Sequence, residues 1–232
     1  ITQNPLTPQQ ARDLVLNVMT PPQREEFEKT HECNFAIGVS GVGRFRISCF
    51  YQRNQVGMVL RRIETHIPSI EELNLPPIIK TLAMTKRGII IFVGATGTGK
   101  STSLAAMIGY RNQNSTGHII TIEDPIEFVH KHAGCIITQR EVPNNCPSFA
   151  DGLRASLRED SDIVLVGEMR DLETISLALT AAETGLLVFG TLHTNNARKT
   201  VDRIIDVFPA EQQSQARTML AGSLRGVVAQ LL

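Results

Sequence analysis

The sequence predicts an α/β protein, in which a parallel sheet covered by helices follows a smaller α+β domain. After residue 77, short and nearly continuous apolar runs alternate with helical patterns, which is typical of parallel strands buried on both faces. Before residue 67, helical segments are followed by strands in which apolar and polar residues alternate. Between these regions, residues 67–77 hold three prolines and follow neither pattern, which indicates a domain boundary.

The composition argues against a nucleic-acid-binding, a disulfide-stabilised or a membrane-spanning protein. The 232 residues carry 23 basic and 23 acidic side chains and are only 5% aromatic, so we expect neither a basic groove nor a stacking surface for nucleic acid. The four cysteines have no C-x-x-C or zinc-ligand spacing, which favours free thiols in a reducing compartment. No apolar run approaches the ~20 residues that span a bilayer. Because the chain begins with Ile1 rather than Met, we expect that it was shortened.

The N-terminal domain, predicted over residues 1–66, begins with two helices. Thr7 and Gln10 form a capping box around Pro8, and the stretch 20–23 repeats this start signal for a helix that runs toward Lys29. Strands are predicted at 35–40, 44–50 and 56–63.

The second domain, predicted over residues 78–232, alternates strands and helices. Strands are expected at 89–93, 118–122, 163–166 and 187–191, and helices at 78–85, 101–112, 148–158, 171–184, 196–207 and 211–231. In such sheets, ligands bind beyond the carboxyl ends of the strands. Functional groups are therefore expected at those ends.

The first strand end carries a phosphate-binding loop. Gly94-Ala95-Thr96-Gly97-Thr98-Gly99-Lys100-Ser101 fits G-x-x-x-x-G-K-[ST] between a strand and a helix that begins near Thr102. Glycines allow the backbone to aim N–H groups at phosphate oxygens, and the helix adds its positive dipole end. Lys100 is the candidate for the β- and γ-phosphates and Ser101 for Mg²⁺. The chain lacks an Asn-Lys-x-Asp motif that would read guanine, so ATP is the expected nucleotide.

Two further strands end in carboxylates. Glu168 is the candidate for polarising an attacking water, although the aspartate that commonly precedes such a glutamate is Gly167 here. Glu168 can instead be a carboxylate that favours a helix N-terminus. Glu123 is the candidate for orienting water or holding a hydrated Mg²⁺. Asp124 either joins the site or caps the turn before Pro125.

A histidine and several arginines complete the candidate set. His193 follows the last predicted strand, where it either hydrogen-bonds the γ-phosphate or is a structural histidine. Phosphoryl transfer commonly uses an arginine against the developing charge. Arg46 and Arg61 are candidates, with Arg62 as a close alternative, but an ordinary polar strand face also accounts for them.

Four motifs, taken in order, resemble those of the PilT/PilU family of type IV pilus retraction ATPases, which are hexameric motors of the secretion-ATPase superfamily. They are GATGTGKST, TIEDPIEFVH, VGEMRDLETISLALTAAETG and GTLHTNNA. The resemblance covers nearly the whole chain. Residues 24–140 are more similar to PilU, and residues 151–232 are more similar to PilT.

The resemblance implies a PAS-like domain, a linker at 67–77 and a RecA-like P-loop ATPase domain. It assigns Glu123 and Asp124 to an acidic box, Glu168 to the Walker B catalytic position and His193 to a histidine box. Arg46 and Arg61 match the small-domain arginines that reach a nucleotide at a domain or subunit boundary.

The resemblance also implies the setting in which the chain works. Its cofactors are ATP and Mg²⁺, and its partners are further copies in a hexameric ring, an inner-membrane platform protein and a paralogous retraction ATPase. The location is cytoplasmic and peripheral to the inner membrane. Two departures matter: Leu186 replaces a second histidine of the family, and a C-terminal region with a motif needed for retraction lies beyond Leu232.

Three functions are therefore compared. The leading hypothesis is a motor in which ATP hydrolysis moves the small domain through the 67–77 hinge and drives pilus retraction. The second is a nucleic-acid motor of the RecA type, which the charge balance disfavours. The third is a weakly hydrolysing accessory subunit that acts through a partner ATPase.

Overall fold

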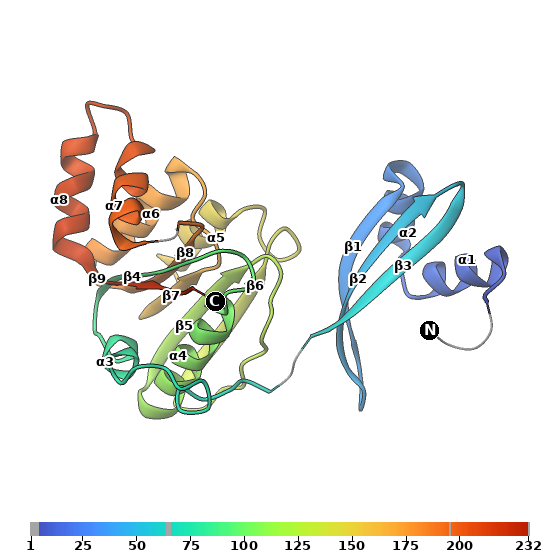
Figure 1. Ribbon diagram of the computed structural model, residues 1–232, viewed down its shortest axis with the longest axis horizontal. Helices are drawn as coiled ribbons and strands as arrows, with labels where there is room; N and C mark the ends of the chain where they lie inside the picture. The colour runs from blue at the N-terminus through green and yellow to red at the C-terminus, as the bar shows by residue number, and fades with distance from the viewer. Residues whose placement is uncertain (1–4, 64–65, 195, 232) are drawn as a thin grey trace. The chain divides into compact units, whose positions relative to one another are not determined.

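The computed structural model describes residues 5–63, 66–194 and 196–231, and it divides into two units, Ile1–Thr65 and His66–Leu232 (Figure 1). The segment 67–77, which we expected to be a linker at the domain boundary, belongs to the second unit. Ile70 is 2% exposed in a core of that unit, and the partly buried Leu73 and Leu75 pack against the same core. The prolines thus mark a segment that is irregular but anchored by its apolar side chains.

The first unit places two helices on one face of an antiparallel sheet. Helices α1 (Pro8–Asn17) and α2 (Pro21–Thr30) begin with the predicted capping residues, since Thr7 and Thr20 each donate a backbone N–H to the glutamine three residues later, at 2.9 Å. Strands β1 (Glu32–Val39), β2 (Gly43–Gln52) and β3 (Gln55–Ile63) pair in that order. The core is made of buried side chains from both layers: Val15, Met19, Phe27, Cys33, Phe35, Ile47 and Cys49.

The second unit is built on a parallel sheet, so the predicted α/β fold is confirmed. Among the described residues its strand order is β6-β5-β7-β8-β4-β9. The four expected strands are β4 (Gly88–Val93), β5 (Gly117–Glu123), β7 (Ile163–Val166) and β8 (Leu187–Leu192). Strands β6 (Cys135–Glu141) and β9 (Leu224–Ala229) were not predicted.

The prediction of one helix over 211–231 was wrong. Helix α8 (Gln213–Ser223) ends where β9 begins, and β9 pairs in parallel with β4. Gly226, Val227 and Val228 account for the difference, because glycine and β-branched residues are poor helix formers, and β-branched residues favour strands. The apolar content of this segment therefore serves a sheet edge rather than a helix face.

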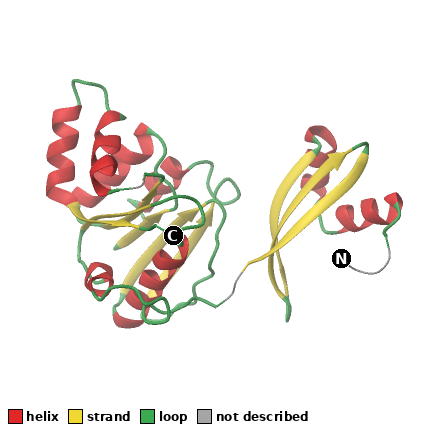
Figure 2. Cartoon of the chain, viewed as in Figure 1, coloured by secondary structure: helices red, strands yellow, loops and turns green. Residues whose placement is uncertain are grey.

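Helices cover both faces of this sheet (Figures 1 and 2). One core packs α5 (Phe149–Ser156), α6 (Leu172–Glu183), α7 (Ala197–Asp206) and α8 against alternate strand residues. The other core packs α3 (Ile78–Ala83) and α4 (Lys100–Asn114) against the residues between them. Among the described helices, none is long and apolar enough to cross a membrane.

Candidate active site

The carboxyl ends of the parallel strands bring most of the predicted groups to one edge of the sheet. Because β5, β7, β8 and β4 are neighbours in that order, the edge carries Glu123, Glu168, His193 and then the phosphate loop. The phosphate loop lies between β4 and α4, as the motif requires. Polar groups from four strands therefore surround one strip of the sheet.

The backbone of the phosphate loop depends on its glycines. Gly94, Gly97 and Gly99 have φ angles of +149°, +84° and +87°, which residues with a Cβ rarely adopt. Gly99 is also the N-cap of α4, a helix of 15 residues whose N-terminal N–H groups and dipole favour a phosphate. The loop therefore has the form of an anion cradle.

Lys100 lies within this cradle. Its Nζ donates hydrogen bonds to the carbonyl oxygens of Gly94 at 2.8 Å and Ala95 at 2.9 Å. Burial lowers the pKa of the Lys100 ammonium, although the carboxylates of Glu168 and Glu127 act in the opposite direction. The ammonium is thus held inside the loop, within reach of a bound phosphate.

Both carboxylate oxygens of Glu168 have a partner. Its Oε1 lies 3.2 Å from Nε2 of His193, and its Oε2 lies 2.5 Å from a guanidinium nitrogen of Arg170. Burial alone raises the pKa of Glu168, but the hydrogen bond and charge of Arg170, together with His193, outweigh it and the pKa is lowered. The carboxylate is therefore kept ionised. Arg170 was not predicted as a site residue, although it lies only two positions after Glu168 in the same motif.

The backbone around Gly167 leaves no room for the aspartate that commonly precedes such a glutamate. A Cβ at this position would lie 3.0 Å from the carbonyl oxygen of Ile122 and 3.2 Å from Cα of Glu123. The two strands approach closely here, and the Gly167 N–H donates to that same carbonyl at 2.8 Å. The space beside β5 that a side chain would need is filled by backbone.

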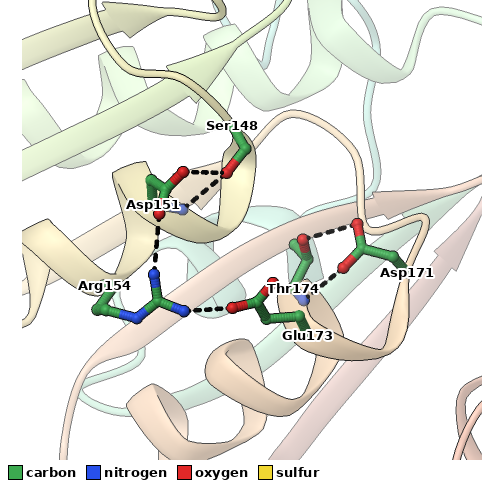
Figure 3. A network of polar contacts seen from close by, with 6 residues as sticks. All are labelled: Ser148, Asp151, Arg154, Asp171, Glu173 and Thr174. Carbon is green, nitrogen blue, oxygen red and sulfur yellow. Dashed lines mark hydrogen bonds and ion pairs between the residues drawn. The ribbon is translucent and has the colours of Figure 1, made fainter.

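A polar network supports the loop that carries Glu168 (Figure 3). Asp171 caps α6 by accepting from the N–H of Thr174 at 2.8 Å and from its hydroxyl at 3.0 Å. Arg154 of α5 pairs with Glu173 of α6 and with Asp151, at 2.9 Å for the second pair. The start of α6, four residues after Glu168, is thus tied to α5.

Glu123 is oriented by its neighbours. Its Oε1 accepts a hydrogen bond from the hydroxyl of Thr121 at 2.6 Å and another from the amide of Gln139 at 3.3 Å. Burial raises the pKa of Glu123, and these hydrogen bonds only partly offset that effect. Gln139 was missed because β6, which carries it, was not recognised in the sequence.

Asp124 acts on the site electrostatically, because it helps to raise the pKa of Arg170 after the larger effect of Glu168.

The residues present fit a nucleotide with Mg²⁺. Ser101 is exposed at the start of α4, so its hydroxyl is accessible to a metal, and Glu123 ends the strand on the far side of Glu168. The structure, over the residues it describes, has no cluster of three or more histidine, cysteine, aspartate or glutamate side chains that would hold a metal unaided.

Arg46 and Arg61 lie in the first unit, on adjacent strands of its sheet. They are direct partners in the register between β2 and β3, and both are exposed. They belong to the face that does not contain the core residues Ile47 and Cys49, because successive side chains of a strand point to opposite faces. Two like charges directly opposite each other repel, so this cross-strand pair does not stabilise the sheet.

The sequence was also compared with known proteins. A model of the type II/IV secretion system protein family matches residues 34–232. The chain is 59% identical over its full length to the type IV pilus ATPase PilU of Pseudomonas aeruginosa, and 50% identical over 98% of its length to the type IV pilus retraction ATPase PilT of the same species. It spans 61% and 66% of the lengths of these two relatives.

Two solved structures of ATPases are also similar to this chain. The crystal structure of the pilus retraction motor PilT with bound ADP superposes with a TM-score of 0.91 and 52% identity, over 93% of this chain and 63% of that one. The ATPase DotB of Legionella pneumophila superposes with a TM-score of 0.84 and 32% identity, over 97% and 64% of the two chains.

Proposed function

Because this chain belongs to the type II/IV secretion system protein family, and to its PilT/PilU branch of type IV pilus ATPases, we propose that it is the ATP-hydrolysing part of a motor that retracts pili. The observation that carries the proposal is the shared edge of the sheet, where the phosphate loop, Glu168, His193 and Glu123 meet. Such an arrangement serves phosphoryl transfer, which depends on positioning and on charge stabilisation.

Each group has a role in this reaction. The N–H groups from Gly94 to Thr102 and the ammonium of Lys100 hold the phosphates of ATP. Glu168, kept ionised by its two partners, accepts a hydrogen bond from the attacking water and orients it. His193, whose Nε2 contacts Glu168, hydrogen-bonds the γ-phosphate. Bound Mg²⁺ would neutralise phosphate charge, with Ser101 and Glu123 as the residues that hold it or its water shell.

Arg46 and Arg61 are proposed as the cations that act on the developing charge of the phosphoryl group. The proposal rests on their cross-strand pairing and exposure together with the family pattern. We further propose that copies of the chain assemble into a hexameric ring at the cytoplasmic side of the inner membrane. There, a platform protein of the pilus would receive the movement.

The test is an ATP turnover assay with two variants. Lys100→Ala removes the ammonium and is expected to abolish both nucleotide binding and turnover. Glu168→Gln keeps the shape but not the charge, and is expected to bind ATP while losing at least 100-fold in turnover, in line with the contribution of a positioned acid or base of roughly 10²–10⁴. Glu183→Gln, on the exposed end of α6, is the matched control. Normal turnover in Glu168→Gln would sink the catalytic assignment.

A second candidate function is that of an accessory subunit, and the higher identity to PilU than to PilT favours it. In this case the chain binds nucleotide with little turnover alone and acts together with a paralogous ATPase. The two functions differ in one measurement, which is turnover on mixing with that paralogue. Independent turnover supports the motor, whereas turnover that appears only in the mixture supports the accessory role.

A further inference from the structure

Gln230 follows β9 and lies beside the phosphate loop. In the parallel register, Ala229 is the partner of Val93, the last residue of β4. The backbone N–H of Gln230 then donates to the carbonyl of Val93 at 2.8 Å. The residue that follows β4 is Gly94, so the chain places Gln230 against the first residue of the loop.

The backbone of Gln230 touches Gly94 closely. A Cβ at position 94 would lie 2.4 Å from the carbonyl oxygen of Gln230 and 2.6 Å from the hydroxyl of Thr98. No side chain fits between these atoms, which is a second reason for glycine here besides its φ of +149°. The start of the loop is therefore enclosed between Gln230 on one side and Thr98 on the other.

The side chain of Gln230 reaches the other end of the loop. Its Nε2 donates to the hydroxyl oxygen of Ser103 at 2.7 Å. Ser103 is 3% exposed, lies in the first turn of α4 and donates its N–H to the carbonyl of Gly99 at 2.9 Å. One residue therefore contacts both ends of the loop, the start through its backbone and the end through its amide.

The oxygen of the Gln230 amide differs from its nitrogen in having no partner among the described residues. Oε1 of Gln230 is buried, and no hydrogen-bond partner for it is present among the described residues. A buried acceptor without a partner lowers stability, and such atoms in folded proteins call for an explanation. Within the described residues, the contact of Nε2 with Ser103 is therefore the hydrogen bond through which this amide acts.

We propose that Gln230 is a positioning residue that fixes the spacing of the phosphate loop before a nucleotide binds; this rests on the proposed nucleotide binding. A loop rich in glycine samples many backbone conformations, and ordering it costs free energy at the moment of binding. Gln230 holds the two ends at a set separation, so that less ordering remains to be done. Its effect is on affinity for the phosphates, through the loop and without contact to the nucleotide.

The experiment measures the affinity of the chain for fluorescent ADP, and its melting temperature without nucleotide. Gln230→Ala and Ser103→Ala each remove the side-chain hydrogen bond. Each is expected to weaken ADP binding about five- to tenfold, the effect of one hydrogen bond. The double variant is expected to bind no more weakly than either single one, because both changes remove the same contact.

Gln213→Ala is the matched control. It deletes a glutamine on α8 whose amide donates to the carbonyl of Phe208 at 3.2 Å, away from the loop. It is expected to lower the melting temperature as much as Gln230→Ala while leaving ADP affinity unchanged. Affinity in Gln230→Ala equal to that of the control, or single effects that add in the double variant, overturns the inference.

Two other outcomes are also decisive. If Gln230→Ala does not fold, Ser103→Ala alone decides: weaker ADP binding by a folded variant supports the inference, and unchanged binding overturns it. If the unaltered chain binds no ADP, the proposed function fails. If the unaltered chain and the variant both bind ADP normally, the inference about Gln230 fails and the proposed function stands.

Discussion

Nε2 of His193 lies 3.2 Å from Oε1 of Glu168, while the guanidinium of Arg170 contacts the other oxygen of the same carboxylate. Both oxygens of the proposed catalytic group are thus occupied by cationic or polar partners. His193 comes from the end of β8 and Glu168 from the end of β7, so the pairing of two strands sets this contact. Arg170 is 68% exposed, so its guanidinium is accessible to water.

Replacing Arg170 is expected to move the pH profile of turnover. The Arg170 guanidinium lowers the pKa of Glu168 against the effect of burial, so Arg170→Ala raises that pKa. Turnover that needs the ionised carboxylate is lost as the pH falls through its pKa, and the acid limb therefore shifts to higher pH. A pH series of kcat checks this, with exposed Arg217→Ala on α8 as the control. An unshifted limb would contradict the assigned ion pair.

Glu123→Gln is expected to stabilise the fold while lowering turnover. Burial raises the pKa of Glu123, so its contribution to stability is present at low pH and is lost as the pH rises through the pKa of the folded state. Glutamine removes the cost of the buried charge and keeps an oxygen for the hydroxyl of Thr121. We expect a higher melting temperature at pH 8 and no gain at pH 4. Exposed Glu183→Gln should change neither value.

Gly167→Ala is expected to destabilise the second unit. The added methyl group meets the Ile122 carbonyl at 3.0 Å and must push β5 away from β7. Overpacking of this kind costs about 1–3 kcal/mol. Gly222→Ala, in α8, meets nothing within 4 Å and is expected to stabilise by about 0.5–1 kcal/mol. Chemical denaturation of both variants gives the comparison, and equal effects would disprove the close approach at residue 167.

Asp171→Ala tests whether the cap of α6 serves catalysis as well as stability. Loss of the cap costs about 0.5–2 kcal/mol and frees the loop that carries Glu168. Thr7→Ala removes a comparable cap from α1 in the other unit, where Thr7 accepts from the N–H of Gln10 at 3.2 Å. We expect similar losses in stability but a fall in kcat only for Asp171→Ala. A fall in both variants would mean that kcat follows stability rather than the loop.

The sequence predicted the groups whose position depends on short-range pattern. The phosphate loop, Glu123, Glu168 and His193 each end an apolar run, and the parallel sheet then brings these ends together. Gln139 was missed because it lies on β6, and Gln230 was missed because it directly follows β9. These strands have mixed polarity or follow a helix directly, and only pairing with a distant strand makes them strands.

Interactions that depend on distances below 4 Å could not be predicted from the sequence either. The pairing of Arg170 with Glu168 is a rotamer choice, and several other partners were equally open to that arginine. The lack of room at Gly167 depends on how closely β5 approaches β7, and no periodicity encodes that spacing. The position of the first unit's arginines on one face follows from the register between β2 and β3, which was expected only in outline.

The passage from α8 into β9 has a mechanical consequence. No loop separates Ser223 from Leu224, so a displacement of the helix pulls directly on the strand. A tension along β9 loads its hydrogen bonds to β4 in shear, all at once, whereas a tension across the sheet peels them apart one by one. The link is therefore stiff along the axis that leads to the phosphate loop and compliant across it. Force applied to α8 reaches the loop as a push or pull of Gln230 against Gly94.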